Sequence, residues 1–228
     1  MLLFALALCM SGPAEPAVAV VELFTSQGCS SCPPADKLLG ALDRQPGVIA
    51  LSFHVSYWDY IGWRDPYAQK AFDGRQKAYA RKLGVRTYTP QMVVNGQHAF
   101  VGSDRREADT YVKKALARPA GVTISLRVAW LDGQLQVAYS LAGNPPGTLQ
   151  INLALIQVKG NNAVKAGENR GRRLSHTNVV RVFKQVGRHE TDVVLAVPKK
   201  LDRKGLALVV YAQDQTTLAI LGATLSAL

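Results

Sequence analysis

Short apolar runs alternate with amphipathic stretches over residues 18–119 of the 228-residue chain. The run V-A-V-V-E-L-F is short and rich in β-branched residues, which predicts a buried strand. In P-P-A-D-K-L-L-G-A-L-D the apolar residues have helical spacing, and the prolines fall in the first turn, where a helix tolerates them. The same reasoning predicts strands at 18–24, 48–56, 88–96 and 98–102, and helices at 33–43, 66–83 and 103–118, the last capped by Ser103. This order indicates an α/β domain.

The period of the pattern changes at Gly121. Apolar and polar residues then alternate strictly in V-T-I-S-L-R-V-A-W and again after the turn Asp132-Gly133, which predicts a hairpin. Further strand-like runs follow at 149–158, 178–186, 191–198, 206–213 and 217–222. Because no convincing helix interrupts them, we expect an all-β antiparallel sandwich over 120–228, after an α/β domain over 18–119.

The charge is basic and uneven. Of the +11 net charge, residues 1–120 contribute 14 basic against 10 acidic side chains, and residues 121–228 contribute 13 against 6. Such a balance favours contact with anionic surfaces, such as nucleic acid, anionic lipid or cell-wall polymer. Eight basic residues lie between Lys159 and Arg188, yet Phe183 is the only aromatic residue among them. Nucleic-acid binding usually pairs basic patches with stacking aromatics, so we expect a solvated basic loop and no nucleic acid.

Residues 1–17 have the pattern of a secretory signal. They are apolar for about ten residues, too short to span a bilayer, and end in small residues and prolines. We expect cleavage after Ala14, although no basic residue precedes the apolar part. A lipoprotein modified at Cys9 is the alternative, with Leu8 where a small residue is usual. The expected mature protein is secreted or periplasmic, has no membrane span, and keeps two cysteines in a compartment where disulfides persist.

Those cysteines, Cys29 and Cys32, lie between the first predicted strand and the first predicted helix. Unpaired amide N–H groups and the positive dipole end of a helix start stabilise a thiolate, which favours Cys29 as a nucleophile. Cys32, one turn further, would then resolve the mixed disulfide. This arrangement predicts a thiol–disulfide oxidoreductase that acts on protein thiols or disulfides with a reducing or oxidising partner protein and needs no cofactor.

Other interpretations of the pair stay open. A structural zinc site needs four ligands, and no second C-x-x-C exists. His54 or Met92 could complete a copper site with the two sulfurs. An inert disulfide is also consistent, although so small a ring constrains little of the unfolded chain. The alternative function is therefore a copper-binding or partner-binding envelope protein without catalytic turnover, or a purely structural one.

Thr89-Pro90 precedes a predicted strand, the setting in which a cis peptide can be retained. The segments V-V-E-L-F-T-S-Q-G-C-S-S-C-P-P-A-D and Y-T-P-Q-M-V-V-N-G resemble the thioredoxin-like superfamily. More closely, the chain resembles the DUF1223 family of bacterial secreted proteins, because its stretches H-V-S-Y-W-D-Y-I-G-W-R-D-P and G-E-N-R-G-R-R-L-S-H-T-N-V-V-R look like signatures of that family. The superfamily resemblance implies Cys29 as nucleophile, Cys32 as resolving cysteine and Pro90 as a cis-proline beside the dithiol. The dipeptide between the cysteines, Ser-Ser, differs from the Gly-Pro of thioredoxin and leaves the redox potential open.

Glu22 is the one charged residue of the first strand. Thioredoxin has a buried acid in the corresponding strand, so the resemblance implies that Glu22 assists proton transfer at Cys32, although its spacing from Cys29 is one residue longer. A strand-end glutamate facing solvent is the alternative. For His54 the expectation is a hydrogen-bonded core histidine, with a role near the thiols as the alternative.

The loop after the second strand is dense in aromatic and acidic residues, and ligands collect at such positions in α/β sheets. We expect it to form a wall of a substrate cleft together with Thr89, and aromatic packing under a long loop is the alternative. The candidate substrate-binding residues are Thr89, Tyr57, Trp58 and Trp63. A second polar segment, 168–178, is expected to bind a ligand or to close its own loop by hydrogen bonds.

Overall fold

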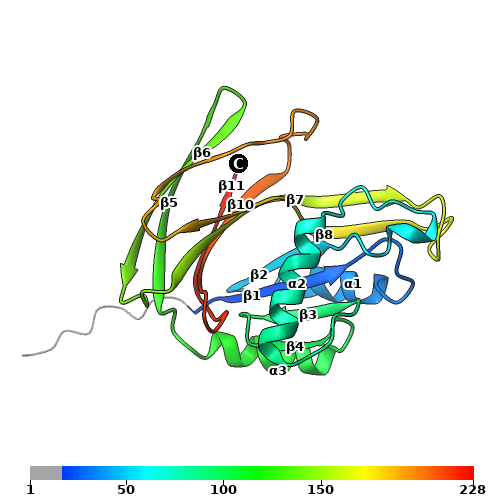
Figure 1. The fold of residues 1–228 in the computed structure, drawn as a ribbon, viewed down its shortest axis with the longest axis horizontal. Coiled ribbons are helices and arrows are strands. Elements are labelled where there is room, and N and C mark those ends of the chain that lie inside the picture. Colours follow the sequence, from blue (N-terminus) through cyan, green and yellow to red (C-terminus); the bar gives the residue numbers. More distant parts are fainter. Residues whose placement is uncertain (1–16) are drawn as a thin grey trace, which may run out of the picture.

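The computed structural model describes residues 17–228, so the predicted signal segment lies outside the described residues except for Ala17. The first half has the predicted order of elements (Figure 1). Its strands are β1 (Ala19–Thr25), β2 (Val48–His54), β3 (Gln91–Val94) and β4 (His98–Val101). Its helices are α1 (Pro33–Leu42), the short 3-10 helix η1 (Asp59–Ile61), α2 (Lys70–Leu83) and α3 (Arg105–Leu116).

The second half consists of strands, as the alternating pattern predicts. They are β5 (Val122–Leu131), β6 (Gln134–Gly143), β7 (Leu149–Ala163), β8 (Arg173–Gly187), β9 (Asp192–Leu195), β10 (Leu206–Asp214) and β11 (Ile220–Ala227). Between residues 17 and 228, no helix is long and apolar enough to cross a membrane.

The prediction of a thioredoxin-like α/β domain followed by a separate all-β sandwich is wrong. Eight strands from both halves form one mixed sheet in the order β11-β10-β7-β8-β2-β1-β3-β4. The junction is a parallel contact of β2 with β8, at Ser52 and Val179. An uncovered β2 edge would present unpaired backbone groups, and β8 covers it. Patterns along single strands do not reveal such long-range pairing. The division of the chain into two domains at 119/120 stays a prediction.

The remaining strands form a second sheet, in the order β5-β6-β9, which packs on the far part of the large sheet (Figure 1). Alternating residues of β5 and β6, such as Val122, Ile124 and Leu135, share a buried core with Ile151 and Leu153 of β7. The expected sandwich layer therefore exists, but one of its two sheets is continuous with the α/β half.

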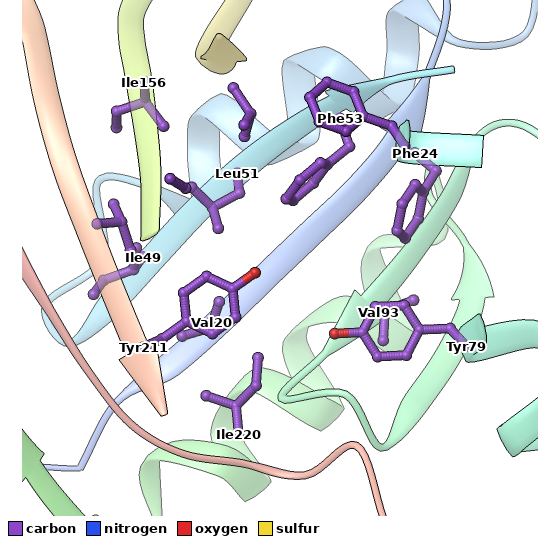
Figure 2. Packing of buried hydrophobic residues seen from close by; sticks show 14 of the residues in the cluster. Val20, Phe24, Ile49, Leu51, Phe53, Tyr79, Val93, Ile156, Tyr211 and Ile220 are labelled. Carbon is purple, nitrogen blue, oxygen red and sulfur yellow. The ribbon is translucent and has the colours of Figure 1, made fainter. Parts of the chain in front are cut away.

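The two faces of β1 carry different groups of side chains. Val20 and Phe24 pack with residues of β2, α2 and β10, including Phe53, Tyr79 and Tyr211 (Figure 2). Ala19, Val21 and Leu23 face the opposite core, formed with the helices α1 and α3. The cysteines at the start of α1 therefore belong to the second face.

Two helix starts differ from the sequence-based expectation. α3 is capped by Asp104, whose carboxylate accepts the N–H of Glu107, and not by Ser103. α2 begins at Lys70, because Pro66 lies in the turn-rich segment that precedes it.

Candidate functional site

Cys29 and Cys32 are joined by a disulfide, with their Cα atoms 5.4 Å apart. Both residues are fully buried, whereas Ser30 and Ser31 between them are exposed. The Ser31 hydroxyl lies 3.3 Å from Cys29 Sγ. The pair thus lies at the predicted junction of β1 and α1, under a short exposed loop.

The first turn of α1 offers few amide groups to a thiolate. Pro33 and Pro34 occupy its first positions and have no N–H. The next two N–H groups, those of Ala35 and Asp36, both donate to the Cys32 carbonyl. Stabilisation of a Cys29 thiolate therefore depends on the helix dipole and on the nearby Ser31 hydroxyl more than on free amides, which refines the expectation from sequence.

The connection between β7 and β8, residues 164–172, closes over the cysteine loop. The Asn169 side-chain amide donates to the carbonyls of Gln27 and Cys29, at 2.9 Å each. The Ser30 N–H donates to the Glu168 carboxylate at 2.9 Å. Hydrogen bonds from Ser30 hold the pKa of Glu168 below its usual value. The polar segment predicted at 168–178 thus contacts the cysteines, and its later residues belong to β8.

The aromatic loop borders the site on another side. A Cβ added at Gly28 would lie 3.1 Å from Trp58 Cβ, so the loop packs directly on the residue before Cys29. The Trp58 indole N–H donates to the Thr89 hydroxyl at 2.7 Å. The Thr89–Pro90 peptide is cis, as the resemblance implies. Tyr57 is the most exposed of the four candidate substrate-binding residues, at 36%.

Pro90 packs near the first turn of α1. A Cβ added at Gly102 would lie 3.1 Å from Pro90 Cβ and 3.2 Å from Ala35 Cβ, which places both residues against Gly102. The structure therefore brings Cys29, Cys32, Trp58, Thr89 and Pro90 into one region.

A chain of side-chain contacts leads from Trp63 through Gln27 and His176 to Asp36. The Trp63 indole N–H can only donate, so its partner at 3.1 Å is the side-chain oxygen of Gln27. The NH₂ nitrogen of Gln27 is therefore the atom that lies 3.3 Å from His176 Nε2. His176 Nε2 therefore accepts, and its proton resides on Nδ1. Nδ1 faces Asp36 Oδ1 at 3.4 Å.

Asp36 is the end of this chain and lies four residues after Cys32, on the same side of α1. Its other oxygen accepts the Thr25 hydroxyl at 3.3 Å. Asp36 Oδ1 and His176 Nδ1 have no closer partner among the described residues. A carboxylate with a free lone pair thus lies one helical turn from the second cysteine.

His54 is a buried, hydrogen-bonded core histidine, as expected. Its Nδ1 lies 2.7 Å from Asp65 Oδ2, and its ring meets His176 edge to face at 4.6 Å. Burial opposes the charged imidazole, but the charges of Asp65 and Asp36 and the Asp65 hydrogen bond outweigh it and raise the pKa of His54. Burial likewise opposes the Asp65 carboxylate, but His54 and two backbone N–H groups, from Gln27 and Tyr67, lower the pKa of Asp65.

Glu22 lies elsewhere, on the face of β1 turned to α2. Its carboxylate accepts two hydrogen bonds from Arg75, at 2.8 and 3.0 Å, and one each from the hydroxyls of Tyr79 and Tyr211. The group is fully buried. Glu22 is neither solvent-exposed nor gathered with the cysteines, and its partners are those of a structural ion pair.

No group of three His, Cys, Asp or Glu side chains within residues 17–228 has the geometry of a metal site. Met92 packs in the core under α1 and α3, whereas His54 is bound to Asp65. Copper binding by the two sulfurs with His54 or Met92 stays a prediction.

Asp36 and Gln27 escaped the sequence analysis, whereas His176 and Asn169 lie in the polar segment predicted at 168–178. Asp36 follows Cys32 by one helical turn, a spacing that could have revealed it. Gln27 has no local signal, because its contact with His176 joins distant segments. Asn169 belongs to a noticeably polar stretch, but only the pairing of β2 with β8 places it over Cys29.

The family model described as "Protein of unknown function (DUF1223)" matches residues 20–213, and the chain belongs to this family. A crystal structure of an Agrobacterium tumefaciens protein is 32% identical, with 93% of this chain and 95% of that chain covered and a TM-score of 0.71. HBP35 of Porphyromonas gingivalis is 12% identical, with 95% of this chain and 77% of that chain covered and a TM-score of 0.66, a likeness of fold alone. No curated protein matches the chain.

Proposed function

We propose that this chain is a thiol–disulfide oxidoreductase that exchanges disulfides with other proteins through Cys29 and Cys32. The observation that supports the proposal is a bonded C-x-x-C pair at a strand-to-helix junction, with Asp36 one turn behind the second cysteine. Cys29 precedes the exposed Ser30-Ser31 loop and is the attacking sulfur, and Cys32, at the helix start, is the resolving sulfur.

The exchange proceeds in two balanced steps. In the reduced protein, the Cys29 thiolate attacks a substrate disulfide, forms a mixed disulfide, and releases one substrate sulfur, which takes a proton from water. Cys32 then gives its proton to Asp36 and attacks Cys29, which re-forms the protein disulfide and releases the second substrate sulfur. That sulfur takes up the proton held by Asp36. Two electrons pass to the substrate, a partner protein restores the dithiol, and the reverse sequence oxidises a substrate dithiol.

His176 serves this exchange as a positioning residue. Its Nδ1–H faces the Asp36 carboxylate, and its tautomer is fixed through Gln27 by the donor-only indole of Trp63. This contact of 3.4 Å restricts the rotamer of the carboxylate and leaves its lone pairs available for the Cys32 proton.

Access to the dithiol requires movement. Both sulfurs belong to fully buried residues, and the loop carrying Glu168 and Asn169 is bound across the Cys29 segment. Loops held by a few hydrogen bonds open more easily than strands in a core. We propose that release of this loop uncovers Cys29 and that Trp58 and Thr89 border the opened site.

We propose an exported location, secreted or periplasmic. A disulfide persists in oxidising compartments and is rare in a reducing cytosol, and the N-terminal sequence has the pattern of a secretory signal.

Insulin reduction, together with equilibration against glutathione buffers, tests the proposed function. The wild type is expected to reduce insulin and to have a defined dithiol potential. Cys29→Ser should abolish exchange, whereas Cys32→Ser should retain the first step and accumulate a mixed disulfide. An inactive wild type, or an active Cys29→Ser variant, would overturn the proposal.

A further inference from the structure

A groove of about 650 Å³ runs beside α1, from Pro33 to Arg44, and faces the β7–β8 hairpin. One end adjoins the residue after Cys32, and its lining includes Asp36 and His176. The groove is therefore continuous with the surroundings of the dithiol. In Figure 1, α1 and the far ends of β7 and β8 lie at the same side of the molecule.

The lining of this groove is strongly basic. Among the described residues that line it, Asp36 is the one carboxylate, and it is buried. Five exposed cations line both walls: Lys37, Arg44, Lys159, Arg172 and Arg173. Within residues 17–228, none of these five has a carboxylate oxygen within 4.0 Å. A concave surface whose charges lack internal partners attracts an anionic ligand.

We infer that this groove binds an acidic polypeptide segment that flanks the reacting cysteine of the substrate. The inference rests on the proposed function, since it specifies the substrate class of the same site. α1 has ten residues and is about 15 Å long at 1.5 Å per residue, which matches four or five residues of extended chain at about 3.3 Å each. A segment of that length would extend from Arg44 to the reacting sulfur.

The lining favours a polypeptide over a nucleic acid. Among the described lining residues there is no Phe, Tyr or Trp, so the groove lacks the aromatic platform on which single-strand binders stack successive bases. Asn161 and Ser175 stand on the hairpin wall and offer uncharged polar groups to a peptide backbone. Arg172 is already oriented by a hydrogen bond to Asn169, the residue that covers Cys29. Occupancy of the groove and uncovering of the disulfide would therefore involve adjoining residues.

Fluorescence anisotropy of a labelled acidic peptide, with Ser in place of its cysteine, measures docking without redox chemistry. The double reversal Lys37→Glu/Arg173→Glu is expected to weaken binding at least about tenfold. The matched control Lys199→Glu/Lys204→Glu changes the net charge equally, in the exposed segment between β9 and β10, and should have little effect. Circular dichroism verifies that each variant is folded.

Equal binding of the acidic peptide and a glutamine-substituted peptide would overturn the inference. Equal weakening by both double reversals, or equally tight binding of a single-stranded oligonucleotide, would also overturn it. Reduction of the small neutral bis(2-hydroxyethyl) disulfide separates the two proposals. Cys29-dependent turnover of that compound without peptide preference rejects only the docking groove, whereas peptide docking without any turnover rejects the oxidoreductase.

Discussion

The side-chain amide of Asn169 donates a hydrogen bond to the carbonyl of Cys29, a residue 140 positions earlier in the chain. The same amide also donates to the Gln27 carbonyl. One buried side chain from the second half of the protein thus secures two backbone groups of the cysteine loop. The covering of the disulfide is therefore a specific contact and not a consequence of general packing.

Asn169→Ala should make the disulfide easier to reach. Two hydrogen bonds of about 1 kcal/mol each correspond to a roughly 30-fold change in the open population, so reduction by a small thiol should be faster by about that factor. Stopped-flow reduction with dithiothreitol measures the rate. The matched control is Asn161→Ala, since Asn161 accepts a hydrogen bond from Ser175 on the exposed hairpin. Equal rates in wild type and Asn169→Ala would show that the loop does not control access.

Asp36→Asn should slow the second step of exchange while leaving the first intact. Loss of a proton acceptor for Cys32 is expected to cost about 100-fold in that step, and the mixed disulfide should accumulate. Single-turnover measurements across a range of pH follow both steps. His176→Gln should give a smaller decrease, because it removes the N–H that orients Asp36. Unchanged kinetics in Asp36→Asn would remove Asp36 from the mechanism.

Glu22→Gln should affect stability and not exchange. It leaves the charge of buried Arg75 without its carboxylate, which typically costs about 3–5 kcal/mol. The same carboxylate raises the pKa of Arg75 against the opposing effect of burial. Urea unfolding measures the loss, and the exchange rate per folded molecule should equal that of the wild type. A slower resolving step in this variant would restore the role that the resemblance implies for Glu22.

The His54–Asp65 pair predicts a pH dependence of stability. The pKa of His54 is raised in the folded state, so its contribution is complete below the ordinary value of 6.5 and is lost as pH rises through the folded pKa. The pKa of Asp65 is lowered, so its contribution is present above 3.8 and is lost as pH falls through the folded pKa. We expect stability to decline above pH 6.5.

Urea unfolding of the oxidised protein at several pH values tests this dependence. His54→Gln should reduce the loss of unfolding free energy above pH 6.5. The neighbouring Asp36, Arg181 and His176 are present in both proteins, so their effects are common to both. If the loss of stability above pH 6.5 is unchanged in His54→Gln, another titrating group causes it.

Local patterns in the sequence predicted most elements and the disulfide, but not the sheet that joins them. β1, α1 and β5 follow directly from apolar spacing, and the cis Thr89–Pro90 follows from the superfamily resemblance. The pairing of β2 with β8 and the contact of Gln27 with His176 depend on segments far apart in the chain, for which one sequence contains no periodic signal. For the same reason, the sequence alone does not show that Arg75, Tyr79 and Tyr211 surround Glu22.

The parallel contact of β2 with β8 also bears on how the protein is made. β2 cannot gain its outer neighbour until Val179 has been synthesised, so the cysteine half stays incomplete through most of translation. A fragment ending near residue 119 would keep both cysteines but lose Asn169, His176 and the strand beside β2. The dithiol is consequently not a portable module, and grafting its half onto another protein would transfer the sulfurs without their cover.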